Sequence, residues 1–445
     1  MENIYLFMII ALGFLAIADL VVGVSNDAVN FLNSAIGSKA ISMKTILIVA
    51  SIGVAFGAIF SSGMMEVARK GIFNPEMLMF SDIMIIFMAV MITDILLLDF
   101  FNTIGMPTST TVSIVFELLG AAVAVSLIKI GAADGNFSDV VNYINTSKAT
   151  EIIVGILLSV VIAFTIGALV QYIARLLLSF KFEEKANWVG SLFGGIALTG
   201  IMYFILLKGI KDTSFAGENY NVLSGLTISD FLEKFVSLIV LINLVVWFLV
   251  SYILTAVFKV NIYKIIIVAG TFGLALAFAG NDLVNFIGVP IAAYQSYEAW
   301  VVSGIAPDAF EMGFLAKKVP TPTILLFISG IVMILTLWFS KKARYVTQTE
   351  INLSREGSSQ ERFEPNYLSR SLVRSSKAIS KYFLLKTPKP ILAKIDKQFE
   401  KPNLHLDTKK AKDMPAFDYV RAAVNLMVAS VLISIATSYK LPLST

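Results

Sequence analysis

The chain has 445 residues, of which 57% are hydrophobic and only 15% are charged, and its mean hydropathy is +0.80. A soluble globular protein of this length does not need so much apolar surface, whereas apolar runs of about 20 residues are long enough to cross a bilayer. The chain has no cysteine and a single histidine, His405, which excludes disulfides and thiolate metal sites and argues against a histidine-based metal centre or proton relay. The composition predicts an all-α polytopic membrane protein.

Apolar runs predict ten spanning helices, separated by polar loops that include 131–148 and 211–229. The first run lacks a basic segment and a cleavage site, so it predicts a spanning helix and not a signal peptide. Gly288 and Pro290 interrupt the apolar stretch 284–305, which predicts a short span or a re-entrant piece. The expected helices are 4–24, 44–63, 83–104, 106–128, 150–178, 189–208, 231–256, 262–280, 321–340 and 417–437.

Charge is concentrated in one polar segment. Residues 340–415 hold 17 Lys and Arg against 8 Asp and Glu, whereas the net charge of the whole chain is only +4. Basic loops of membrane proteins remain cytoplasmic, so this segment predicts a cytoplasmic loop and an outside N-terminus. This orientation places four basic residues on the outer side of the membrane, which counts against it. They are Arg69, Lys70, Lys317 and Lys318. The simplest interpretation of the segment is a solvated linker. The alternative is an amphipathic helix around 367–400 that binds anionic lipid.

A polar phrase occurs twice among the apolar residues. The first copy is Asn26-Asp27-Ala28-Val29-Asn30-Phe31, and the second is Asn281-Asp282-Leu283-Val284-Asn285-Phe286. A carboxylate at membrane depth is costly and is usually functional. Carboxylate and amide oxygens suit Na⁺ or another hard cation, and helix breaks at Gly23 or Gly280 would add free carbonyl oxygens. Each Asp could instead merely cap a helix, but two matching copies favour a cation site between two halves.

A second phrase is also duplicated. Pro107-Thr108-Ser109-Thr110-Thr111 follows one predicted helix, and Pro442-Leu443-Ser444-Thr445 follows another. Hydroxyls and free backbone N–H groups at a positive helix end form an anion site, and phosphate fits it. Ordinary capping is the alternative for a single copy. The two phrases occur in the same order in helices of opposite predicted direction, which predicts an inverted repeat interrupted by the basic segment.

The expected organisation has five parts. They are a first inverted repeat over 1–130, connecting helices over 131–256, the first part of a second repeat over 257–340, a basic cytoplasmic loop over 341–415, and the continued second repeat over 416–445. Asp94, Asp99 and Glu117 lie inside predicted helices, where each could line the pathway or pair with a polar group of a neighbouring helix.

At these motifs the chain resembles the inorganic phosphate transporter (PiT) family. The family carries a Gly-Asn-Asp-x-x-Asn motif in each of two inverted halves, matched by GVSNDAVNFLNSAIGS and FAGNDLVNFIGVPIAAYQS. It also carries a Leu-Pro-x-Ser-Thr-Thr element in each half, matched by GMPTSTT and KLPLST. The resemblance covers roughly 1–340 and 416–445, with Ser25 in place of the usual small residue. Because the family continues beyond this point, the sequence is expected to be truncated at its C-terminus.

The resemblance implies a multi-pass cell-membrane symporter that is not an enzyme and that couples phosphate to a cation, with Na⁺ favoured, by alternating access. It implies that Asp27, Asn30, Asp282 and Asn285 coordinate Na⁺, with Asn26 and Asn281 close by, and that Ser109, Thr110, Thr111, Ser444 and Thr445 hold phosphate. No cofactor besides the coupling ion and no nucleic-acid partner is expected. Coupling to H⁺ with a metal–phosphate cargo, a receptor or scaffold role, and homo-oligomerisation stay open. An intramembrane enzyme is disfavoured because Asp94 and Asp99 have the wrong spacing for one helix face.

Overall fold

The structure is a computed structural model that describes residues 2–59, 71–209, 226–316, 322–355, 364–400 and 415–438. Within these ranges the chain is helical, and its extended backbone amounts to two isolated bridges, one of which joins Phe73 to Ile144. Seven described helices are long and apolar enough to cross a membrane, or eight if one bent pair counts as a span. The prediction of an all-α polytopic membrane protein is therefore confirmed.

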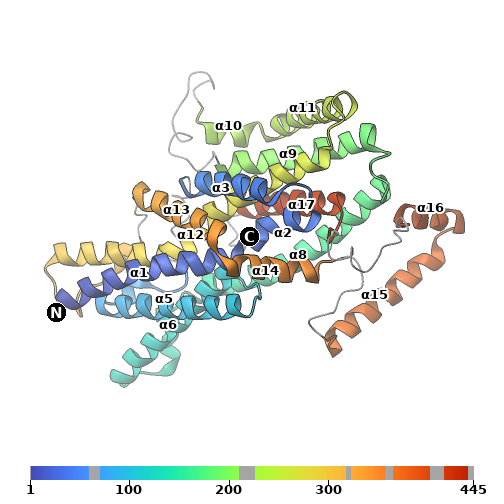
Figure 1. Ribbon diagram of the computed structural model, residues 1–445. Helices are drawn as coiled ribbons and strands as arrows, with labels where there is room; N and C mark the ends of the chain where they lie inside the picture. Colours follow the sequence, from blue (N-terminus) through green and yellow to red (C-terminus); the bar gives the residue numbers. More distant parts are fainter. Residues whose placement is uncertain are drawn as a thin grey trace.

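The observed helices follow the predicted ones in order, and most of their ends lie within a few residues of the predicted positions (Figure 1). The long helices of the bundle are α1 (Glu2–Asp27), α3 (Met43–Ile59), α5 (Phe80–Thr103), α6 (Thr110–Ala132), α8 (Thr146–Leu178), α9 (Ser191–Gly209), α11 (Val236–Ala256), α12 (Ile262–Ser303), α13 (Thr323–Phe339) and α17 (Tyr419–Ser438). Shorter helices are α2 (Val29–Ser38), α7 (Val140–Tyr143), α10 (Ile228–Lys234), α14 (Lys341–Leu353), α15 (Tyr367–Lys386) and α16 (Lys389–Phe399).

Two expected helix breaks are absent. Helix α12 runs without interruption through Gly280, Gly288 and Pro290, and the predicted re-entrant piece is simply its second half. Likewise α1 does not break at Gly23, and the backbone bonds from Ala28 to Val24 and from Leu32 to Ala28 carry it almost continuously into α2. Buried packing around α12 tolerates the missing Pro290 N–H, which the apolar sequence alone did not reveal. The pronounced break lies instead between α13 and α14, which are bent by 66° at Ser340.

Helix α12 is the centre of the bundle and contacts α1, α3, α9 and α17 along its length. Glycines allow the closest crossings. A Cβ at Gly57 would lie 2.2 Å from the carbonyl oxygen of Leu276, and one at Gly23 would lie 2.0 Å from the ring of Phe286. Membrane helices that approach this closely gain dispersion contacts without needing a hydrophobic driving force. These crossings fix the two Asn-Asp phrases, on α1 and α12, in the middle of the bundle.

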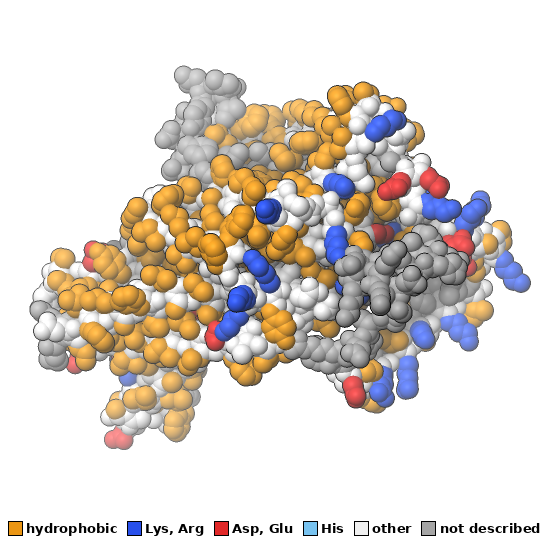
Figure 2. All heavy atoms as spheres, viewed as in Figure 1, with side chains coloured by type: hydrophobic (Ala, Val, Ile, Leu, Met, Phe, Trp, Pro, Cys, Tyr) orange, Lys and Arg blue, Asp and Glu red, His pale blue; other side chains and the backbone are white. Residues whose placement is uncertain are grey.

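The surface divides into two kinds of region. Much of the face in Figure 2 is covered by hydrophobic side chains, as expected for helices that face lipid. Basic side chains gather at the right of that view, around α15 and α16, which stand beside the bundle in Figure 1. Residues 367–400, for which an amphipathic helix was the alternative to a solvated linker, form two exposed helices. The orientation of the chain and the inverted repeat stay predictions.

Candidate transport site

The first Asn-Asp phrase closes a polar contact between the end of α1 and the loop that precedes α6. The side-chain amide of Asn26 donates to Asn102 Oδ1 (2.9 Å) and to the Met106 carbonyl (3.2 Å), and its oxygen accepts from the Thr108 backbone N–H (2.7 Å). Asn102 in turn donates to the Val22 carbonyl (2.7 Å). Asn26 is fully buried, so these bonds hold the loop in one position relative to α1.

The loop delivers the start of α6 to Asp27. Gly105 adopts a φ of +66° beneath the ring of Tyr345, a conformation that favours glycine. Ser109 then caps α6 by accepting the Val112 N–H (3.3 Å). The next residue, Thr110, donates its hydroxyl to Asp27 Oδ2 at 2.6 Å. The positive end of α6 therefore lies directly against a buried carboxylate.

The second phrase meets the same helix start from the opposite side. Thr111 lies with its hydroxyl 3.5 Å from Asp282 Oδ1 and accepts a bond from the Asn285 amide at 3.1 Å. Asn285 also donates to Asp282 Oδ1 at 3.3 Å. Asp282 and Asn285 are three residues apart on α12, so they share one face of the helix. Two adjacent threonines of α6 thus connect the two halves of the predicted repeat.

The site is acidic and contains no basic side chain of its own helices. Asp27 and Asp282 are each almost fully buried and lie close enough to interact electrostatically. The stretches 1–38, 71–128 and 265–316 include α1, α5 and almost all of α6 and α12, and contain no Lys, Arg or His. Two buried carboxylates without a cation are strongly unfavourable. Their oxygens, together with threonine hydroxyls and the amide oxygens of the phrase, form a set that suits a hard monovalent cation.

The remaining predicted site residues that the structure describes make fewer contacts with the two buried carboxylates. Asn30 is exposed, and Asn281 is half-buried. Ser109 is occupied by capping. Ser444 and Thr445 lie outside the described residues. The structure adds Asn102, which sequence reasoning missed because a single Asn in an apolar helix has no second copy to single it out.

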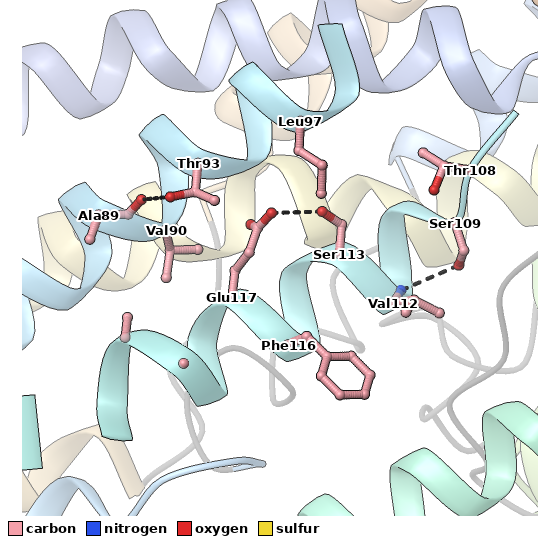
Figure 3. A pocket seen from close by; sticks show the side chains of 12 residues that line it. Ala89, Val90, Thr93, Leu97, Thr108, Ser109, Val112, Ser113, Phe116 and Glu117 are labelled. Atoms are coloured by element: carbon pink, nitrogen blue, oxygen red, sulfur yellow. Dashed lines mark hydrogen bonds between the residues drawn. The ribbon is translucent and has the colours of Figure 1, made fainter. Parts of the chain in front are cut away.

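A cavity of about 560 Å³ opens beside the start of α6. Thr108, Ser109 and Val112 line one end of it, and Ser113, Phe116 and Glu117 continue the lining along α6 (Figure 3). Leu97, Thr93 and Val90 of α5 form the facing wall. The cavity therefore reaches the predicted anion-binding element from the side of α5 and α6.

Helices crossing a membrane around a buried polar site define a multi-pass membrane protein with a site at its core. The sequence profile of the phosphate transporter family matches residues 23–347. The chain is 27% identical over 320 residues to a putative phosphate permease of Thermococcus kodakarensis, a match that covers 69% of this chain and 68% of that protein. It is 25% identical over 324 residues to another from Pyrococcus furiosus, covering 69% and 67%.

A solved structure described as the sodium-dependent phosphate transporter has the same fold, with a TM-score of 0.60 at 16% identity, over 98% of this chain and 86% of that one. The family profile covers well over half of the chain. The protein therefore belongs to the phosphate transporter family.

Proposed function

We propose that the protein is a Na⁺-coupled symporter of inorganic phosphate that works by alternating access. The observation that carries the proposal is the start of α6, where Thr110 contacts Asp27 of the first Asn-Asp phrase and Thr111 contacts Asp282 of the second. A phosphate bound by these threonines and by the N–H groups of α6 would sit beside both carboxylates. Its negative charge then has to be balanced.

Bound Na⁺ would supply the positive charge that the residues around the site lack. Two unit charges about 4 Å apart interact by about 4 kcal/mol at the effective dielectric near a protein surface. A phosphate beside Asp27 and Asp282 would therefore be strongly repelled unless cations bind with it. Asp27, Asp282 and Asn285, with Asn26, Asn30 and Asn281 nearby, are the proposed Na⁺ ligands. Ser109, Thr110 and Thr111, with Ser444 and Thr445, are the proposed phosphate ligands.

The names of relatives support the same cargo and coupling ion. Relatives in two archaea are described as putative phosphate permeases, and the structural neighbour is described as sodium-dependent. The test is uptake of labelled phosphate into liposomes that contain the purified protein. We expect uptake driven by an inward Na⁺ gradient and little uptake when choline replaces Na⁺. Equal uptake in the two salts would refute Na⁺ coupling.

Alternating access has its own test, because the chain contains no cysteine. A single cysteine in place of Phe116 would lie in the cavity wall, where this side chain is 47% exposed. We expect Na⁺ and phosphate together to change its rate of labelling by a water-soluble thiol reagent, while a cysteine in place of the exposed Ser371 on α15 reacts at a constant rate. A Phe116→Cys labelling rate that ignores both ligands would count against the mechanism.

A further inference from the structure

A second group of acidic side chains lies in the bundle, apart from the paired Asn-Asp phrases. Asp19 of α1, Asp94 of α5 and Glu117 of α6 meet where these three helices pack together. Asp19 and Asp94 are completely buried, and Glu117 is half-buried. We call these three residues the acidic triad. The proposed symport chemistry at Asp27 and Asp282 makes no use of it.

Ser113 joins two members of the triad. Its Oγ lies 2.6 Å from Asp94 Oδ1 and 2.7 Å from Glu117 Oε1. Figure 3 shows the second of these contacts, with both side chains on the same side of α6. A serine hydroxyl has one proton to donate, and an ionised carboxylate can only accept. Both contacts can be hydrogen bonds only when one of the two carboxyls carries a proton and donates it to Ser113.

Asp19 leads to the same requirement independently. It is 0% exposed, and neither of its oxygens has a hydrogen-bond donor among the described residues. Its carboxyl lies close enough to those of Asp94 and Glu117 to interact with them electrostatically. An ionised Asp19 with no donor would carry the large penalty of an unpaired buried charge.

No basic side chain pairs with the triad among the residues that the structure describes. The stretches 1–38, 71–128 and 265–316 lack Lys, Arg and His. The other acids of α5 are engaged elsewhere, Asp82 with Lys129 and Asp99 with Lys342. A further acid, Asp27, acts on the triad from outside and itself faces Asp282 of α12.

A proton fits this site better than a metal ion does. No group of three or more acidic, His or Cys side chains in the described part of the chain has an arrangement that could hold a metal ion. The short contacts through Ser113 leave carboxyl and hydroxyl oxygens at hydrogen-bond distance from one another. A bound cation would instead separate these oxygens to coordinate them. The geometry thus favours shared protons between the acids.

The cavity beside α6 gives the proton a route. Glu117 and Ser113 line it, and Thr108 and Ser109 of the anion-binding element line its other end. Water that reaches the phosphate element therefore also reaches Glu117. From there Ser113 leads inward to Asp94, and Asp19 is buried beside Asp94. Glu117 is therefore accessible from the cavity, whereas Asp19 and Asp94 are buried away from solvent.

We propose that Asp94 and Glu117, joined through Ser113, form with the neighbouring Asp19 a proton-binding site that exchanges with solvent through the cavity beside α6. In transport this proton is a second coupling ion beside Na⁺, a role that rests on the proposed symport. Proton binding itself does not depend on that role. The two statements are therefore tested by separate measurements.

Infrared spectroscopy of the purified protein tests proton binding. A protonated carboxyl has a C=O band distinct from that of a carboxylate, and the band shifts in D₂O. We expect this band at neutral pH in the unmodified protein, and expect it to be reduced by Asp19→Asn, by Asp94→Asn and by Glu117→Gln. The control is Glu151→Gln, because Glu151 is an exposed acid paired with Lys148 on α8 and should leave the band unchanged. Folding of each variant is checked by its thermal unfolding.

The outcomes separate the alternatives. A band missing from the unmodified protein, or one that all three folded triad variants retain in full, overturns the proton site. Weakened binding of labelled Na⁺ in Asp19→Asn without any such band would identify a cation site and would also overturn it. In liposomes, we expect Glu117→Gln to flatten the pH dependence of Na⁺-driven phosphate uptake. An unchanged pH profile would overturn the coupling role. Uptake by the unmodified protein that does not depend on Na⁺ would refute the proposed symport and the coupling role beside Na⁺, and would leave proton binding to the infrared test.

Discussion

The two copies of the Asn-Asp phrase have nearly the same sequence and different surroundings. In the first copy the first Asn, Asn26 at the end of α1, makes three hydrogen bonds to neighbouring chain segments, and the last, Asn30 at the start of α2, is exposed. On α12 the last Asn, Asn285, bonds to both Thr111 and Asp282, and the first, Asn281, is half-buried. The amide of Asn26 holds the loop before α6, whereas the amide of Asn285 bonds to Thr111 and Asp282 in the candidate site. The same residue pattern therefore occurs twice, and corresponding residues of the two copies make different contacts.

The largest expected effect comes from the carboxylate of the first copy. Asp27→Asn removes a buried charge and weakens the 2.6 Å bond from Thr110. Hydrogen bonds to charged groups contribute about 1.5–3 kcal/mol, and each 1.4 kcal/mol is about tenfold. We expect Na⁺-driven phosphate uptake in liposomes to fall by at least about tenfold. Glu151→Gln is the control, and full uptake by Asp27→Asn would show that the first copy does not carry the coupling ion.

The structural role of Asn26 predicts a loss of stability. Asn26→Ala leaves the Thr108 N–H and the Asn102 side chain without their buried partner. An unsatisfied buried group costs about 1–3 kcal/mol, so we expect the free energy of unfolding to fall by about that amount. Thermal unfolding in detergent, followed by tryptophan fluorescence, measures the change. Asn30→Ala should stay within about 0.5 kcal/mol because its side chain is exposed, and equal losses in the two variants would contradict the asymmetry.

Glycines before the two phrases provide a matched pair. A Cβ at Gly23 would overlap the ring of Phe286, whereas the closest atom to a Cβ at Gly280 is the Gly57 carbonyl oxygen at 3.9 Å. Overpacking costs about 1–3 kcal/mol, so Gly23→Ala should lower the unfolding temperature. Gly280→Ala should be neutral or stabilising by up to about 1 kcal/mol, the helix preference of Ala over Gly. A reversed order would mean that α1 and α12 do not cross at Gly23.

The smallest expected effect concerns the neutral ligand of the second copy. Asn285→Ala removes two buried hydrogen bonds near Asp282 and leaves its charge in place. A neutral hydrogen bond contributes about 0.5–1.5 kcal/mol, so we expect the Na⁺ concentration for half-maximal uptake to rise about two- to tenfold. Asn30→Ala should change it less. An equal rise in this Na⁺ concentration in both variants would show that the two copies contribute equally to Na⁺ binding.

Sequence patterns were sufficient to find the helices and the site elements. Long apolar runs set most helix ends to within a few residues, and the duplicated phrases identified Asp27 and Asp282 together with the start of α6. The pairing of Thr110 with one Asp and Thr111 with the other could not be derived, because it depends on contacts between residues as many as 174 positions apart. The continuity of α12 past Pro290 was also missed, since local propensity favours a break and only the surrounding helices override it.

The acidic triad shows the limit of reasoning from repeats. Asp94 and Glu117 were considered individually as pathway residues, but Asp19 belongs to no repeated phrase. What identifies the three as a group is that they come from three different helices, that Ser113 joins Asp94 to Glu117, and that Asp19 is buried beside them. The sequence signal that could have found them is the long run of residues without any Lys, Arg or His around each acid.

The unbroken α12 is longer than a membrane is thick. Asp282 lies 20 residues after Ile262 and 21 before Ser303, which places it at the midpoint of the 42-residue helix. At about 1.5 Å per residue each half spans about 30 Å, as much as the hydrocarbon core of a whole bilayer. An ion that binds Asp282 at the centre of the bilayer would cross roughly half of the membrane voltage, about 1.2 kcal/mol per 100 mV. The Na⁺ affinity measured in voltage-clamped membranes should follow that dependence, and a voltage-independent affinity would place the ion near a membrane surface.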